Sequence, residues 1–258
     1  MIKGKFIIAS LGLAATLLSS ASATILDLGT NGSGTINGAY FDVNRDHPTG
    51  TGVYDPFLTV QANGTEQGYN SSTPNFDTKR EPQWNHEIRF SDLQQTTING
   101  TAYYGFSVDI NEPNGGDKST ISLENLKVFT SSTLQNSTST DHNGVFNGSL
   151  GTLRYNLDAG TNNTVLYNDQ QSGSGSGDID IFIPASYFAG TKSNDYVYMY
   201  QFWGGADTTT EGGFEETSLI AGITPVPEMS ALFPIVGLMV AVGSTHVLRR
   251  RRMAKASV

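Results

Sequence analysis

Ten residues decide the fold: Thr101-Ala102-Tyr103-Tyr104-Gly105-Phe106-Ser107-Val108-Asp109-Ile110. Large apolar side chains alternate there with smaller or polar ones, which is the period-two pattern of a strand that buries one face. Asn99-Gly100 stands directly before this stretch and is a strong signal for a two-residue hairpin turn. Pro113-Asn114-Gly115-Gly116 follows it and favours a turn. We therefore expect a long strand that is entered through a hairpin.

The rest of the central chain repeats this pattern in shorter pieces. Residues 121–129 alternate with a slip at Glu124-Asn125, which predicts a β-bulge. Residues 196–203 are almost continuously aromatic or β-branched, as in a central strand that is covered on both sides. Further strands are expected at residues 57–62, 87–90, 153–157, 164–167, 179–183 and 217–223. Because no convincing helical period occurs between the two ends, we predict an all-β domain, an antiparallel β-sandwich of jelly-roll type.

The first 23 residues have the three parts of a secretory signal peptide. Lys3 and Lys5 form a positive region, residues 6–18 are mostly apolar, and Ala21-Ser22-Ala23 supplies the small residues that signal peptidase requires. We therefore expect export through the Sec translocon and cleavage before Thr24.

A second apolar stretch lies near the other end, at residues 231–248, and Arg249, Arg250, Arg251 and Arg252 follow it directly. Eighteen helical residues span about 27 Å, slightly less than a hydrocarbon core of about 30 Å. The arginines would hold this end in the cytoplasm. We expect a transmembrane helix that anchors the chain transiently in the inner membrane, and an ordinary permanent anchor is the alternative.

Val226-Pro227-Glu228, the apolar stretch and the arginine cluster, in this order, resemble the PEP-CTERM sorting signal of bacteria. Members of that family are exported, recognised by an exosortase in the inner membrane, cleaved near the motif, and released or attached at the cell surface. The resemblance implies the same fate here, an exosortase-like membrane protease as partner, and a setting beside exopolysaccharide production. Met229 stands where the family usually has a second proline.

The central domain is itself loosely similar to a domain of unknown activity that occurs with such tails. The similarity rests on Gly50-Thr51-Gly52-Val53-Tyr54-Asp55-Pro56-Phe57-Leu58 and on Gly213-Phe214-Glu215-Glu216. The chain thus divides into a signal peptide (1–23), a β-sandwich surface domain (24–225) and a sorting tail (226–258).

Charge and cysteine content limit the partners of the central domain. Of 15 basic and 24 acidic residues, seven basic and one acidic lie in the two ends, so residues 24–225 carry a net charge of −15. A surface this acidic repels nucleic acid and anionic lipid. The chain has no cysteine, which excludes disulfides, thiolate nucleophiles and sulfur-ligated metals.

Two carboxylates are weak candidates for a cation site. Asp178 and Asp180 lie two apart on an expected strand and would share a face. The Gly/Ser-rich residues 172–177 before them could supply carbonyl oxygens to calcium. A solvated acidic strand face is the commoner arrangement, so calcium stays an open possibility and no metal ligand is assigned.

Catalytic residues are not assigned either. His47, His86 and His142 lie in turn-rich stretches without the spacing of a triad or a zinc motif. Glu215 and Glu216 cannot flank one glycosidic bond, because neighbours on a strand point to opposite faces.

Most aromatic side chains are expected in the core, where strand aromatics usually lie. Trp84 is the exception, because it lies in the polar run 79–86. We predict a non-enzymatic surface or matrix protein without a cofactor that associates with exopolysaccharide. A secreted glycan-active hydrolase and a calcium-stabilised scaffold are the alternatives.

Overall fold

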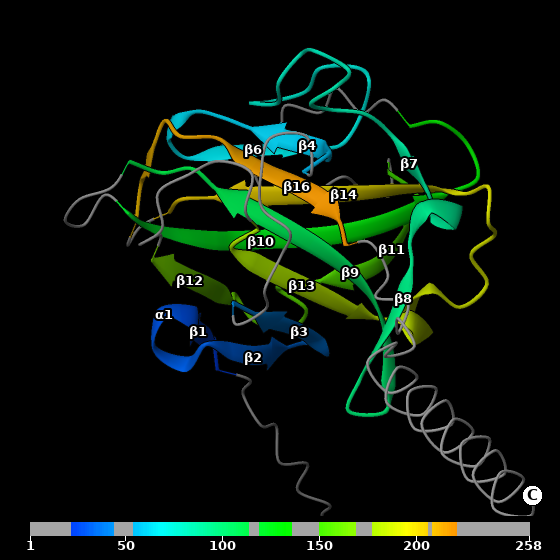
Figure 1. Cartoon of the computed structure of the whole chain (residues 1–258), viewed down its shortest axis with the longest axis horizontal. Coiled ribbons are helices and arrows are strands. Elements are labelled where there is room, and N and C mark those ends of the chain that lie inside the picture. The colour runs from blue at the N-terminus through cyan, green and yellow to red at the C-terminus, as the bar shows by residue number, and fades with distance from the viewer. Residues whose placement is uncertain are drawn as a thin grey trace, which may run out of the picture.

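The computed structural model describes residues 22–43, 54–113, 119–135, 150–168, 177–205 and 208–220. They form two seven-stranded sheets, here called sheet A and sheet B, and a small two-stranded sheet (Figure 1). The predicted all-β, largely antiparallel fold with sandwich character is confirmed. The apolar stretches of the signal peptide and of the tail lie outside the described residues.

Sheet A has the strand order β1-β12-β10-β14-β6, with β11 beside β10 and β7 beside β14. All its neighbours are antiparallel except β1 and β12, which run parallel. Its strands are β1 (Ile25–Asp27), β6 (Glu66–Tyr69), β7 (Ile88–Arg89), β10 (Thr120–Ser131), β11 (Thr152–Asn156), β12 (Thr164–Asn168) and β14 (Tyr196–Trp203).

Sheet B has the order β2-β3-β13-β9-β16-β4, with β8 beside β9. Its strands are β2 (Ser33–Ile36), β3 (Ala39–Asp42), β4 (Pro56–Val60), β8 (Gln95–Ile98), β9 (Thr101–Ile110), β13 (Ile179–Pro184) and β16 (Glu215–Leu219). The small sheet pairs β5 (Asn63–Gly64) with β15 (Thr210–Glu211). The described helices are α1 (Leu28–Asn31) and the 3₁₀ turns η1 (Phe90–Asp92) and η3 (Ala185–Phe188).

The two sheets bury one continuous core between them. Phe106 and Val108 of β9 belong to the same apolar cluster as Leu126 and Val128 of β10, and all four are fully buried. Burial of this kind stabilises a fold by about 25 cal/mol per Å² of apolar surface. The apolar residues at alternate positions thus define each strand and also form the contact between the two sheets.

Several local predictions are confirmed residue by residue. The hairpin turn before β9 has positive φ at Asn99 (49°) and at Gly100 (81°), as a two-residue turn of this kind requires. The register between β10 and β14 shifts between Leu123 and Asn125, where a bulge was expected. Strand β14 lies between β10 and β6, as its apolar run predicted.

Other elements differ from the expectation. Strands β1, β2, β3 and β6 were not anticipated, and β16 begins at Glu215 rather than at residue 217. The short helix α1 was not anticipated either; it begins after Asp27, whose carboxylate accepts a 3.1 Å hydrogen bond from the Thr30 amide. These segments are polar or only a few residues long, so neighbouring strands determine their structure more than their own apolar pattern does.

Candidate functional site

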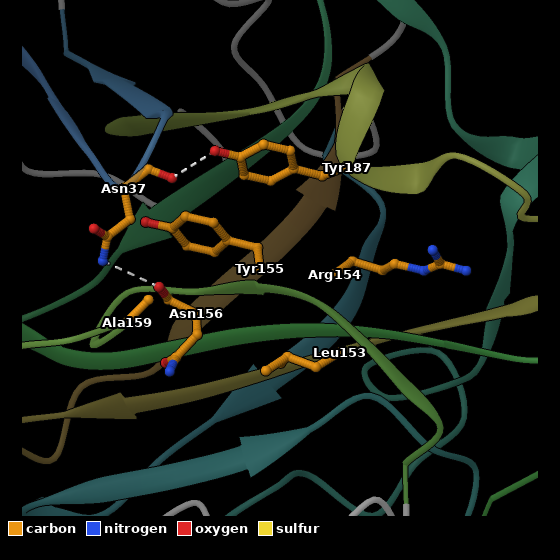
Figure 2. A pocket seen from close by; sticks show the side chains of 7 residues that line it. All are labelled: Asn37, Leu153, Arg154, Tyr155, Asn156, Ala159 and Tyr187. Atoms are coloured by element: carbon orange, nitrogen blue, oxygen red, sulfur yellow. Dashed lines mark hydrogen bonds between the residues drawn. The ribbon is translucent and has the colours of Figure 1, made fainter.

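A hollow of about 410 Å³ opens where three separate segments of the chain meet (Figure 2). These are the turn between β2 and β3, strand β11 with the turn that follows it, and the 3₁₀ turn η3. We call it the Tyr187 hollow; it is lined by Asn37, Leu153, Arg154, Tyr155, Asn156, Ala159 and Tyr187. Its volume lies within the range of sites for small molecules.

The β2–β3 turn forms one wall of the hollow. Asn37 and Gly38 both have positive φ, 48° and 86°, and form a two-residue hairpin between Ile36 and Ala39. The Asn37 side-chain amide donates to the carbonyl oxygen of Leu157 at 2.6 Å. This bond ties the turn to the end of β11, although the two are 120 residues apart in the chain.

Two tyrosines lie side by side in the hollow, and the hydroxyl group of each donates a hydrogen bond to the β2–β3 hairpin (Figure 2). Tyr187 donates to the carbonyl oxygen of Asn37 at 3.0 Å, and Tyr155 donates to that of Ile36, also at 3.0 Å. Tyr155 is buried, and burial raises the pKa of its hydroxyl well above the ordinary value, with smaller contributions from Tyr187 and Asp158. Tyr187 is 38% exposed and presents its ring to solvent.

The positively charged guanidinium group of Arg154 lies at the end of the hollow away from Asn37 (Figure 2). Its Nε donates to Thr130 Oγ1 at 2.7 Å and its Nη1 donates to the carbonyl oxygen of Ala189 at 3.1 Å. Among the described residues, Nη2 meets no acceptor and no carboxylate pairs with the guanidinium. Within the part of the chain that the structure describes, Nη2 could therefore donate two further hydrogen bonds to a ligand.

The lining of the Tyr187 hollow offers apolar surface beside several polar groups. It combines an exposed aromatic ring, amide groups, a guanidinium and the half-exposed side chain of Leu153. None of its seven residues carries a carboxylate, an imidazole or an aliphatic hydroxyl. The hollow thus has the mixture of apolar surface and few fixed polar groups that is typical of ligand sites.

A second hollow, of about 370 Å³, contains titratable groups, including Asp55, His86 and Asp92. Asp92 is already engaged, because one of its oxygens accepts from the Arg89 amide at 2.7 Å at the start of η1. His86 Nδ1 lies 2.9 Å from the carbonyl oxygen of Pro82 and must carry the proton there. Asp92 and His86 are therefore both engaged in hydrogen bonds that stabilise the local backbone.

Asp178 and Asp180, the two aspartates considered for a cation site, have different surroundings in the structure. Asp178 precedes β13, and its carboxylate accepts from the Ile110 amide at 2.8 Å and from the Tyr167 hydroxyl at 3.1 Å. Asp180 lies within β13, opposite Asp42 of β3. Asp178 thus ties the two sheets together. Within the described ranges, no three histidine or acidic side chains are arranged to hold a metal ion.

Other predicted residues fall in different places. Glu215 and Glu216 occupy successive positions of β16 and so point to opposite faces of the sheet, as expected. Trp84 is 38% exposed, which confirms its prediction. Thr24 is tied to the domain, because its backbone nitrogen donates to Asn163 Oδ1 at 2.9 Å. Ala23 is exposed, immediately before it.

The remaining predicted sorting residues lie outside the described residues: Ala21, Val226, Pro227, Glu228, Arg249, Arg250, Arg251 and Arg252, with His47 and His142. No helix within the described part of the chain is both long and apolar enough to cross a membrane. Comparison with family models, with curated proteins and with solved structures finds no match to this chain.

Proposed function

We propose that this chain is an exported bacterial surface or extracellular-matrix protein that binds extracellular polysaccharide and catalyses no reaction. The observation that carries the proposal is the lining of the Tyr187 hollow. A sugar ring has C–H faces that suit the exposed ring of Tyr187, and hydroxyl groups that suit the amide of Asn156 and the free nitrogen of Arg154.

Delivery to the cell surface belongs to the same proposal. A signal peptide cut before Thr24 would start the mature chain one residue ahead of β1, and the Sec translocon and signal peptidase are the partners this requires. The tail would then hold the chain in the inner membrane until an exosortase-like protease cuts near Val226-Pro227-Glu228. The protein would finish at the cell surface or outside the cell.

We also assign the sandwich to the jelly-roll type within this proposal. From β9 onward the chain crosses repeatedly between the two sheets: β9 lies in sheet B, β10, β11 and β12 in sheet A, β13 in sheet B, β14 in sheet A and β16 in sheet B. Jelly rolls are built by such crossings between two facing sheets.

Binding without catalysis is favoured over glycan hydrolysis by the chemistry of the hollow. Most glycoside hydrolases place two carboxyl groups about 5–10 Å apart across the scissile bond. The lining of the Tyr187 hollow contains no carboxyl group. A polysaccharide held there would therefore be bound intact.

The proposal is tested by calorimetric titration of the protein recovered from cells with exopolysaccharide oligosaccharides from the same cells. We expect saturable heat for the native protein and loss of that heat in Tyr187→Ala, while Tyr187→Phe keeps the ring and retains most of the affinity. Leu134→Ala, at an exposed apolar side chain outside the hollow, is the matched control. No heat at millimolar oligosaccharide would contradict the proposal.

Export and sorting need a separate measurement. Intact mass spectrometry of the protein taken from the cell surface should give a chain that begins at Thr24 and lacks the arginine cluster. A surface protein that retained residues 249–252 would contradict exosortase cleavage and favour a permanent anchor.

A further inference from the structure

A second aromatic hollow, of about 330 Å³, is lined by Lys79, Glu81, Gln83, Trp84 and Phe214. We call it the Trp84 hollow. Trp84 comes from the segment between β6 and β7, whereas Phe214 directly precedes β16, so the fold brings two distant aromatic residues together. Trp84 is the more exposed of the two tryptophans, since Trp203 is fully buried.

Contacts within the fold hold both aromatic residues in place. The Trp84 amide donates to the carbonyl oxygen of Glu81 at 2.9 Å, which closes a turn around the ring. The Phe214 carbonyl oxygen accepts from the Asn111 side chain at 3.2 Å. Lys79 Nζ lies 5.9 Å from the centre of the Phe214 ring and is hydrogen-bonded to the side-chain oxygen of Gln61. A ligand would meet surfaces that are already ordered, which lowers the entropic cost of binding.

The polar groups around these rings match a neutral sugar. Lys79 supplies a donor, Glu81 supplies acceptors, and Gln83 supplies both. One positive and one negative side chain leave the lining without net charge, so it offers no preference for an ionic ligand. Sugar hydroxyl groups both donate and accept, and the apolar face of a sugar ring can stack on Trp84.

The two hollows lie at opposite edges of sheet B. The Lys79 amide donates to the carbonyl oxygen of Thr59 in the edge strand β4, whereas Asn37 lies in the hairpin that contains the other edge strand, β2. Figure 1 shows β4 at the top of the molecule and β2 and β3 at the bottom. Six strands lie in order from β2 to β4, and neighbouring strands are about 4.8 Å apart. The two edges of the sheet are therefore separated by roughly 24 Å.

We propose that the Trp84 hollow is a second polysaccharide site and that the domain cross-links polysaccharide chains. The inference rests on the proposed function, because it assumes that the Tyr187 hollow already binds one chain. A short oligosaccharide cannot reach both edges of the sheet, so the two sites fill separately. Long polysaccharide gains from both, because a second attachment raises the apparent affinity without any new contact.

Two titrations of the protein recovered from cells test this inference. Calorimetry with a short exopolysaccharide oligosaccharide measures stoichiometry, and turbidity of the intact exopolysaccharide measures cross-linking. We expect two oligosaccharides per native protein and one for either Trp84→Ala or Tyr187→Ala. Both variants should fail to cross-link, and their apparent affinity for long polysaccharide should fall about 10²-fold. Trp84→Phe keeps an aromatic face and should restore the second site, and Leu134→Ala should behave like the native protein.

The outcomes separate this inference from the function on which it rests. One oligosaccharide per native protein, lost in Tyr187→Ala and unchanged in Trp84→Ala, would overturn the second site and leave the proposed function standing. No binding by the native protein would overturn both. An unchanged melting temperature in Trp84→Ala would show that the loss of binding is not caused by unfolding of the domain.

Discussion

A Cβ atom on Gly38 would lie 2.2 Å from the hydroxyl oxygen of Tyr187. Gly38 also has a φ of 86°, which side chains other than glycine rarely adopt. The hairpin between β2 and β3 therefore uses glycine for two reasons: to make the turn, and to let the tyrosine of the proposed binding site approach the backbone.

We expect Gly38→Ala to weaken polysaccharide binding about tenfold or more, because Tyr187 must move away from the turn. It should also destabilise the fold by about 1–2 kcal/mol. Gly100→Ala is the matched control, since Gly100 has a φ of 81° but nothing within 4 Å of the added atom. Urea unfolding and calorimetry of both variants separate backbone strain from displacement of Tyr187. Equal binding by both variants would contradict this role of Gly38.

Arg154→Lys tests whether the guanidinium is needed for its shape or only for its charge. Lysine cannot donate to Thr130 and to Ala189 while offering a third nitrogen to a ligand, as Arg154 does. We expect weaker oligosaccharide binding, by about threefold to tenfold, with little change in melting temperature. Lys192→Gln removes an exposed charge outside the lining of the hollow and should leave binding unchanged. Native affinity in Arg154→Lys would show that a positive charge alone suffices.

Glu66 should make the stability of the fold depend on pH. Its side chain is fully buried, and burial raises the pKa of its carboxyl group from 4.5 to about 8, with further contributions from Glu112 and Asp77. The folded chain keeps this proton up to about pH 8, whereas the unfolded chain releases it near pH 4.5. The free energy of unfolding therefore falls as the pH rises between these values, by up to about 1.4 kcal/mol per pH unit for this group.

Glu66→Gln should remove this part of the pH dependence, because glutamine is neutral and can still accept the 2.7 Å hydrogen bond from the Ala62 amide. Some slope should remain, since burial and Asp109 also raise the pKa of Glu216, to about 7. Urea unfolding at pH 5, 7 and 9 measures the difference, with the exposed Glu81→Gln as control. Parallel pH curves for native protein and Glu66→Gln would contradict a buried, proton-binding Glu66.

Asn70 extends the pairing of β6 with β14 through its side chain. Its Nδ2 donates to the carbonyl oxygen of Val197 at 3.0 Å, and its Oδ1 accepts from the Met199 amide at 2.6 Å. Asn70→Ala would leave both buried backbone groups without this partner and should destabilise the fold by about 2–4 kcal/mol. Asn162→Ala, at an exposed asparagine, should change stability by less than about 0.5 kcal/mol. Similar unfolding midpoints for the two variants would contradict the role of Asn70.

Strands with a strong apolar period could be predicted from the sequence almost to the residue. β9 and β14 have the predicted bounds, and the bulge falls beside Glu124 and Asn125 as expected. These two strands are predictable because large apolar side chains occupy every second position of β9 and almost every position of β14. β6 was missed because its residues are Glu, Gln, Gly and Tyr, yet all four are buried. Their burial comes from neighbouring strands and cannot be read from their own pattern.

The Tyr187 hollow could not be predicted for a related reason. Its walls come from a turn near residue 37, a strand near residue 154 and a 3₁₀ turn near residue 187, and nothing local indicates that these meet. Tyr187 itself was grouped with aromatic side chains expected in the core, whereas its ring is partly exposed. Trp84 was predicted correctly because the polar residues around it indicate exposure directly. The bonds of Asp178 to Ile110 and Tyr167 depend on the tertiary fold, so they could not be predicted from the sequence.

Strand β16 has a consequence for the timing of folding. It is the last described strand in the chain, yet it lies between β9 and β4, with Leu58 of β4 paired to Thr217. Until residues 215–219 arrive, β4 has no neighbour on that side and sheet B stays divided. A chain threaded through a membrane from its first residue would therefore remain unable to close its sandwich until almost its whole length had crossed. The pairing of β16 with β9 and β4 joins segments that are distant in sequence, and contacts of this kind form slowly, so closure of sheet B would be a late step of folding.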